Sequence, residues 1–186
     1  MDHLKSKIHE IPDFPKPGIL FYDITTLLCD SRGFRDTVDA LAAPYMGEDI
    51  DQVIGIESRG FILGAAVANQ LGCGFVPVRK PGKLPGATHR EAYSLEYGDN
   101  ALEIHTDACA TEKRILVVDD VLATGGTAKA TLDLARKAGG KVIGVAFLIE
   151  LDFLNGRSKL PGENVYSVLH YQPNAPVAQL DRALVS

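Results

Sequence analysis

The chain has 186 residues, of which 46% are hydrophobic and 23% charged, and its formal net charge is −5 at pH 7. This is the composition of an ordinary globular domain with enough apolar residues for a core, and it excludes a disordered chain, a collagen and a coiled coil. The acidic balance argues against nucleic acid as a partner, and the longest apolar run, residues 142–149, is far shorter than the ~20 residues needed to span a membrane.

The predicted elements begin with an arm. Residues 1–30 contain Pro12, Pro15 and Pro17, which fix φ and remove backbone donors, so we expect an extended segment rather than a helix. A helix is expected near residues 31–43, where apolar side chains recur at helical spacing. Short apolar runs then alternate with helical patterns. Strands are predicted at residues 53–56, 75–78, 115–118 and 142–149, and helices at residues 61–71 and 127–138.

This alternation indicates an α/β fold. Strands that are apolar on both faces and separated by helices are typical of a mostly parallel sheet with helices on both sides. No repeat, low-complexity run or long polar linker divides the chain, so we expect a single domain over residues 1–186.

Residues 79–106 depart from the alternation. The stretch from residue 79 to residue 90 carries four cations, two Pro-Gly pairs and no apolar period, which predicts a mobile basic loop on an otherwise acidic protein. Residues 92–96 and 101–105 then alternate around a turn, which predicts a β-hairpin.

The most specific chemistry lies between residues 117 and 128. A buried strand is expected to end there in two adjacent carboxylates, Asp119 and Asp120, and a glycine-containing loop leads from them into a helix. In open α/β sheets, ligands bind beyond the carboxyl ends of the strands, and the N–H groups at a helix start attract phosphate. The residues of this predicted phosphate loop are Ala123, Thr124, Gly125, Gly126 and Thr127.

The two acids separate this loop from the common nucleotide-binding motifs. No Gly-Lys-Ser/Thr follows the glycines, so the segment is not a Walker loop, and it does not match the dinucleotide-binding fingerprint. Adjacent carboxylates at a buried strand end are costly without a task. The task that fits is to hold the 2′ and 3′ hydroxyls of a ribose whose 5′-phosphate occupies the loop.

Residues 117–128 resemble the motif that binds phosphoribosyl diphosphate (PRPP) in type I phosphoribosyltransferases. Three further segments resemble the adenine phosphoribosyltransferases in particular: FPKPGILF at residues 14–21, ESRGF at residues 57–61, and RKPGKLP at residues 79–85 together with LEYG at residues 95–98. The resemblance runs from about residue 8 to about residue 171. It implies the fold of that family, a twisted, mostly parallel sheet with a flexible loop and hairpin (residues 79–106) and an N-terminal arm (residues 1–30) that forms a hood over the base.

The resemblance also implies the reaction, which belongs to purine salvage. The enzyme would transfer 5-phosphoribosyl from PRPP to N9 of adenine, giving AMP and pyrophosphate. Mg²⁺ would be the cofactor, held mainly by PRPP oxygens with no direct protein ligand, as is usual for this ion. The working form would be a homodimer, because part of the basic loop reaches the neighbouring subunit's site in related enzymes.

Roles for individual residues follow from the same resemblance. Glu96 matches the family's acid–base residue, and Asp119 and Asp120 would favour positive charge on the ribose in the transition state. The residues implied for pyrophosphate are Ser58, Arg59, Arg79, Lys80 and Lys83. Those implied for adenine are Leu20, Phe21 and Tyr22.

The sequence departs from the family at two places. Many relatives have Arg where this chain has Tyr22. If only main-chain atoms contact adenine there, specificity is kept, whereas if the Arg side chain contributes, the affinity for adenine differs. Residues 172–186 have no family counterpart, and no role is assigned to this tail.

The expected location is the cytoplasm. The N-terminal residues show no apolar signal region, and the three cysteines lie far apart, which is typical of reduced thiols.

Other functions stay open at this stage. The protein could act on hypoxanthine, guanine, xanthine or orotate, or could be a PRPP-sensing regulator that binds nucleic acid. A regulator would carry a basic face or an added DNA-binding segment, which this chain lacks, whereas it retains Glu96. A plain scaffold protein would have no need for the pair Asp119 and Asp120.

Overall fold

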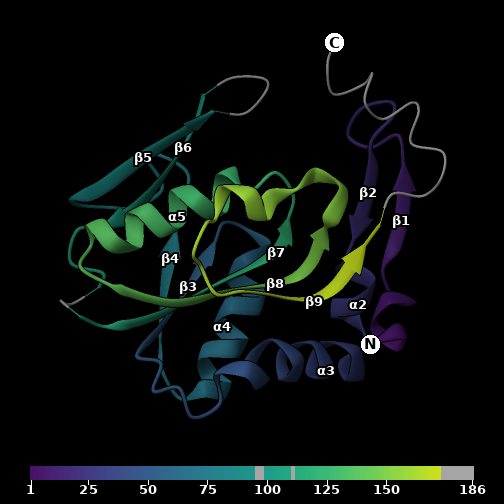
Figure 1. Ribbon diagram of the computed structural model, residues 1–186, viewed down its shortest axis with the longest axis horizontal. Helices are drawn as coiled ribbons and strands as arrows, with labels where there is room; N and C mark the ends of the chain where they lie inside the picture. Colours follow the sequence, from purple (N-terminus) through teal and green to yellow (C-terminus); the bar gives the residue numbers. More distant parts are fainter. Residues whose placement is uncertain (95–98, 110–111, 173–186) are drawn as a thin grey trace.

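A central parallel sheet organises the molecule (Figure 1). The computed structural model describes residues 1–94, 99–109 and 112–172. The sheet has five strands in the order β4-β3-β7-β8-β9, and every neighbouring pair is parallel. Its strands are β3 (Gln52–Ile56), β4 (Gly74–Val78), β7 (Arg114–Leu122), β8 (Lys141–Leu151) and β9 (Val165–Tyr171). The α/β prediction is confirmed.

Helices cover both faces of this sheet (Figure 1). One face carries α3 (Ser31–Ala42) and α4 (Arg59–Leu71); the other carries α5 (Gly126–Lys137) and the hairpin of β5 (Thr88–Ser94) and β6 (Asp99–His105). Side chains of β7 alternate between the two cores, with Leu116 and Val118 in the first and Ile115 and Val117 in the second. This alternation follows from the two-residue period of a strand.

The strand order places a crevice between β3 and β7. The chain leaves β3 through α4 toward one edge of the sheet, and leaves β7 through α5 toward the other edge. Because α4 and α5 pack on opposite faces, the turns that precede them separate beyond the carboxyl ends of β3 and β7. Ligands of doubly wound sheets bind at this switch point.

Most predicted elements are confirmed within two residues. Helix α3 begins after Asp30, whose carboxylate accepts a hydrogen bond from the Gly33 amide at 2.6 Å, as is typical of an N-cap. Helix α4 begins two residues before the predicted start and ends at Gly72, which has a φ of 69°. Glycine suits this left-handed C-terminal position because it lacks a Cβ.

The N-terminal arm is only partly as predicted. It is extended at β1 (His9–Pro12) and β2 (Leu20–Asp23), which pair antiparallel, but it also contains the short helices α1 (Asp2–Lys5) and α2 (Thr25–Cys29). The prediction of no helix was wrong because the prolines lie only between residues 12 and 17. They restrict the end of β1 and the turn after it and leave the flanking residues free.

Four further elements in the described part of the chain were not predicted. They are strand β9 and the 3₁₀ helices η1 (Ala43–Tyr45), η2 (Asp152–Leu154) and η3 (Gly156–Lys159). The hairpin β5–β6 is confirmed, and its turn, residues 95–98, lies outside the described residues, as does the tail beyond residue 172. Within the described part of the chain, no helix is long and apolar enough to cross a membrane.

Candidate active site

A cavity of about 700 Å³ opens at the carboxyl ends of β3 and β7. Its lining comes from strand β2 with the turn before it, the β3–α4 turn, the β7–α5 loop and the segment after β8. Lys80 of the basic loop, Tyr93 and Leu102 of the hairpin, and Gln172 also line it. It brings together most of the residues predicted for the site: Leu20, Phe21, Tyr22, Ser58, Arg59, Lys80, Asp119, Asp120, Ala123, Thr124, Gly125, Gly126 and Thr127. Arg79 and Lys83 are not among its lining residues. Glu96 lies outside the described residues.

The β7–α5 loop has the form expected of a phosphate site. Helix α5 starts at Gly126, and no side chain caps it. Its first N–H groups therefore have no side-chain acceptor, and the positive end of the helix dipole meets the cavity. Gly125, with a φ of 79°, makes the turn from the strand into the helix.

Gly125 is confined by contact with a second segment. A Cβ at Gly125 would lie 2.3 Å from the carbonyl oxygen of Gly156. The backbones of the loop and of the segment after β8 are therefore in contact. Both the lack of space and the positive φ disfavour any residue other than glycine at position 125.

We expect Gly125→Val to abolish PRPP binding, because the loop must move to admit the side chain and the phosphate site is lost. Calorimetric titration with PRPP measures this, and Gly162→Val is the control. Gly162 has a similar positive φ of 78° with open space around it. If folded Gly125→Val bound PRPP as tightly as the control variant, residues 123–127 would not be the phosphate loop.

Asp119 and Asp120 lie inside β7, which continues past them to Leu122, rather than at its end, and this corrects the sequence prediction. Strand β3 pairs with β7 only as far as Val118, whereas β8 continues, with Asp119 opposite Phe147. The strand was expected to stop at the acids because they end its apolar run. One-sided pairing with β8 keeps it extended to Leu122 and leaves the acids beside the crevice.

The two carboxylates are buried at 9% and 7% exposure and have different surroundings. Asp119 Oδ1 accepts a hydrogen bond from the Asp120 amide at 2.9 Å. Asp120 Oδ2 lies 2.8 Å from Arg59 Nε, as an ion pair without hydrogen-bond alignment. Burial and then the Asp120 charge raise the pKa of Asp119 well above its usual value. Without a ligand, the ionised form of Asp119 is therefore unfavourable, and hydrogen-bond donors from a ligand would stabilise it.

This burial predicts a pH-dependent stability. Because the pKa of Asp119 is raised in the folded state, its contribution to the free energy of unfolding is largest below its unfolded pKa of about 3.9 and falls as pH rises through the folded value. Asp119→Asn should therefore melt above wild type at pH 7, by about 2–4 °C for each kcal/mol relieved, and the difference should shrink near pH 4. Thermal denaturation at both pH values measures it. A variant that melts lower than wild type at pH 7 would contradict this reading.

The arm contributes aromatic rings to the site. The Arg59 guanidinium lies 5.2 Å from the ring centroid of Phe21, and Phe14 packs on the edge of the same ring at 5.0 Å. Tyr22 is 6% exposed and packs against Tyr171 of β9, with ring centroids 4.1 Å apart. The Tyr22 side chain therefore anchors the arm to the sheet.

The basic loop is tied to the end of β3 by Glu57. The Arg79 guanidinium donates to Glu57 at 3.2 Å and to the Lys83 carbonyl at 3.1 Å, and the Lys80 amide donates to Glu57 at 3.0 Å. The Lys80 amide and then Arg79 lower the pKa of Glu57. Sequence reasoning did not single out Glu57, although it begins the ESRGF segment. Glu57 holds the loop so that Lys80 lines the cavity.

The loop also contacts the hairpin. The Gly82 amide donates to the Glu103 carboxylate at 3.0 Å, and the His105 ring lies 2.8 Å from the Pro85 carbonyl oxygen. Residues 88–90, predicted as loop, belong to β5, because they pair with β6. The mobility of the remaining residues stays a prediction.

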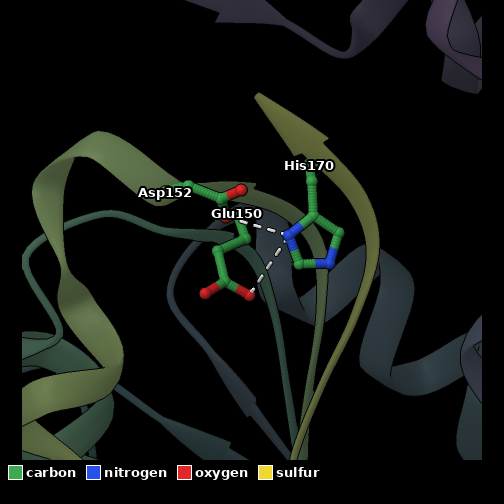
Figure 2. Close-up of side chains that lie close together, drawn as sticks. All are labelled: Glu150, Asp152 and His170. Carbon is green, nitrogen blue, oxygen red and sulfur yellow. Dashed lines mark hydrogen bonds and ion pairs between the residues drawn. The ribbon is translucent and has the colours of Figure 1, made fainter. Parts of the chain in front are cut away.

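One group among the described residues has the composition of a metal site, namely Glu150, Asp152 and His170 (Figure 2). Both Glu150 oxygens already accept hydrogen bonds from Arg157, at 2.6 and 2.8 Å. A cation there would compete with a guanidinium, so we do not assign a metal to this group.

Comparisons with known proteins identify the family of the chain. The sequence model of one protein family, the phosphoribosyl transferase domain, matches residues 28–178. An adenine phosphoribosyltransferase from Acidobacterium capsulatum is 60% identical over 168 residues, which cover 90% of this chain and 93% of that protein. One from Geobacter metallireducens is 57% identical, over 92% of this chain and 100% of that protein.

Solved structures give the same result. The crystal structure of adenine phosphoribosyltransferase from Rhodothermus marinus has a TM-score of 0.88 and 51% identity, covering 91% of this chain and 97% of that one. The Saccharomyces cerevisiae enzyme, crystallised with adenine and an imino-altritol bisphosphate, has a TM-score of 0.87 and 40% identity, covering 90% of this chain and 97% of that one. The chain belongs to the phosphoribosyl transferase domain family and, within it, to the adenine phosphoribosyltransferases.

Proposed function

We propose that the cavity binds PRPP and adenine side by side and that the protein transfers the phosphoribosyl group to adenine, giving AMP and pyrophosphate in purine salvage. The observation that carries this function is the placement, in one cavity, of an uncapped helix start and a buried pair of acids one loop away. The first suits a 5′-phosphate and the second suits the ribose diol. Membership of the adenine phosphoribosyltransferases supports adenine as the base.

Binding follows from the charges of the site. The 5′-phosphate would accept hydrogen bonds from residues 123–127, and the ribose 2′ and 3′ hydroxyls would donate to Asp119 and Asp120. The diphosphate would meet Ser58, Arg59 and Lys80, while Arg79 and Lys83 would act from the loop behind. Arg59 would then exchange its Asp120 partner for a phosphate oxygen, which frees that carboxylate for the ribose.

The chemistry exchanges one bond for another. The bond between C1 of the ribose and the diphosphate oxygen breaks, and its electron pair leaves with pyrophosphate. N9 of adenine bonds to C1, and the N9 proton passes to water. Carboxylates near the ring favour its positive charge in the transition state. We assign to Glu96 a hydrogen bond at N7 during this proton transfer, and to Leu20 and Tyr22 main-chain contacts with adenine beside the Phe21 ring.

The donor set fits Mg²⁺ bound through the substrate. The Asp119 and Asp120 carboxylates would be occupied by the ribose hydroxyls, and Asp120 already pairs with Arg59. We therefore propose that no protein side chain binds Mg²⁺ directly. When bound, Mg²⁺ would neutralise charge on the diphosphate. Waters and phosphate oxygens would be its ligands, as this ion prefers. We also propose a homodimer in the cytoplasm, with part of the basic loop near the partner's site.

The test of this function is a panel of bases. Purified protein with PRPP and Mg²⁺ is offered adenine, hypoxanthine, guanine, xanthine or orotate, and nucleotides are separated by chromatography. We expect AMP from adenine and little or no nucleotide from the others. Preferential IMP, GMP or orotidylate formation would assign a different base, and PRPP binding without any product would favour a regulator.

A further inference from the structure

The segment between β8 and β9 touches the phosphate loop from behind. This wall segment, residues 152–159, comprises η2 and η3, and its Phe153 and Leu154 line the cavity. A Cβ at Gly156 would lie 2.3 Å from the Ala123 carbonyl oxygen, and one at Gly125 would lie 2.3 Å from the Gly156 carbonyl oxygen. Each backbone therefore fixes the other, and a displacement of Gly156 would displace the loop.

The residue after Gly156 locks the wall segment to the sheet. Arg157 donates Nε and Nη2 to the two Glu150 oxygens, at 2.6 and 2.8 Å, and Nη1 to the Val165 carbonyl at 3.0 Å. Ser167 Oγ donates to Glu150 at 2.6 Å. The guanidinium thus joins β8, β9 and the wall segment in the fork geometry that only Arg provides.

The lock depends on Glu150 being charged and buried. Glu150 is 5% exposed. Burial alone would raise the pKa of Glu150, but hydrogen bonds from Arg157 and Ser167 outweigh it and hold the pKa below its usual value. Loss of Arg157 would leave a buried charge without its partner, which is strongly unfavourable, so the wall segment would rearrange.

A second contact holds the start of the same segment. The His170 ring of β9 lies 2.9 Å from Asp152, the first residue of η2 (Figure 2). This pair is exposed and near the surface, where ion pairs contribute little. The Glu150 carboxylate held by Arg157 is buried, although the Arg157 side chain itself is 44% exposed. Because a buried carboxylate depends strongly on its partner, this contact contributes more than the Asp152 pair to the position of Gly156.

We propose that Arg157 is a positioning residue for the 5′-phosphate: its fork on Glu150 fixes Gly156, and Gly156 holds Ala123 and Gly125 in the shape that the phosphate requires. This inference rests on the proposed function of residues 123–127. A merely structural role would affect all ligands or stability alone. Loss of a positioning role would weaken only the binding of ligands that carry the 5′-phosphate.

Arg157→Met tests the proposal against a matched variant, Arg136→Met. Arg136 also pairs with a carboxylate, but from the last turn of α5: its Nη2 donates to both oxygens of Glu163, at 2.7 and 2.9 Å. Calorimetry measures the dissociation constants of AMP, PRPP and pyrophosphate. We expect Arg157→Met to weaken AMP and PRPP alike, by about tenfold or more, since the loss of one hydrogen bond to a charged group costs about that much affinity. Pyrophosphate binding should stay unchanged, and Arg136→Met should change none of the three.

Two results would overturn the proposal: equal weakening of all three ligands, or a lower melting temperature with unchanged AMP affinity. If Arg157→Met does not fold, Arg157→Lys keeps the charge without the fork. It should weaken AMP and PRPP to an intermediate degree, and unchanged affinity would overturn the proposal. Failure of wild type to bind AMP or PRPP would instead reject the phosphate loop itself, and this inference with it.

Discussion

Replacing Asp119 and Asp120 together by Asn should abolish detectable turnover and leave the chain folded. Both side chains are buried in β7 at the edge of the cavity, and Asn has nearly the same volume. The amides cannot supply the negative charge that favours a positive ribose in the transition state. They also accept the ribose hydroxyls more weakly than carboxylates do.

The measurement is AMP formation at saturating adenine and PRPP, with circular dichroism to confirm the fold. Asp133→Asn is the control, because Asp133 lies on α5 in an ion pair with Lys129 and does not line the cavity. That variant should retain wild-type turnover. Near-normal activity in the double variant would remove both acids from the mechanism.

Glu96→Gln should lower kcat by about 10²–10⁴-fold, the usual contribution of a general acid–base group. Gln keeps the length of the side chain but cannot exchange a proton in the same way, so the loss falls on the transition state. PRPP affinity should stay nearly unchanged, because the phosphate loop and the acids of β7 remain. Steady-state kinetics at saturating PRPP, with calorimetric titration of PRPP, separate the two effects.

A matched variant comes from the same hairpin. Glu91 on β5 pairs with Lys137 of α5 and does not line the cavity, so Glu91→Gln should leave kcat unchanged. The opposing hypothesis is that Glu96 only supports the hairpin. In that case Glu96→Gln would shift the melting temperature and leave kcat at the wild-type value.

The sheet was predictable where its signals are local. The apolar runs of β3, β7 and β8 mark strands buried on both faces, and Gly72 ends α4 as the sequence indicates. Strand β9 was missed because Ser167 and His170 interrupt its apolar pattern. Ser167 is buried, and Glu150 of the neighbouring strand accepts its hydrogen bond, a contact that no local pattern reveals.

The same distinction applies to the site. The acids and the phosphate loop occupy one contiguous segment, so their association could be predicted from spacing. The contact of Gly125 with Gly156, and the attachment of Arg79 to Glu57, join residues far apart in the chain. The role of Tyr22 in packing on Tyr171 likewise depends on β9. Such contacts emerge only from tertiary structure.

The central claim is tested most directly by the stoichiometry of one reaction. Wild-type protein with PRPP, Mg²⁺ and adenine is sampled over time, and AMP and pyrophosphate are quantified together. Coupled transfer predicts that the two products appear in equal amounts and that neither appears when adenine is omitted. Pyrophosphate released without AMP, or at the same rate in the absence of adenine, would contradict phosphoribosyl transfer to adenine.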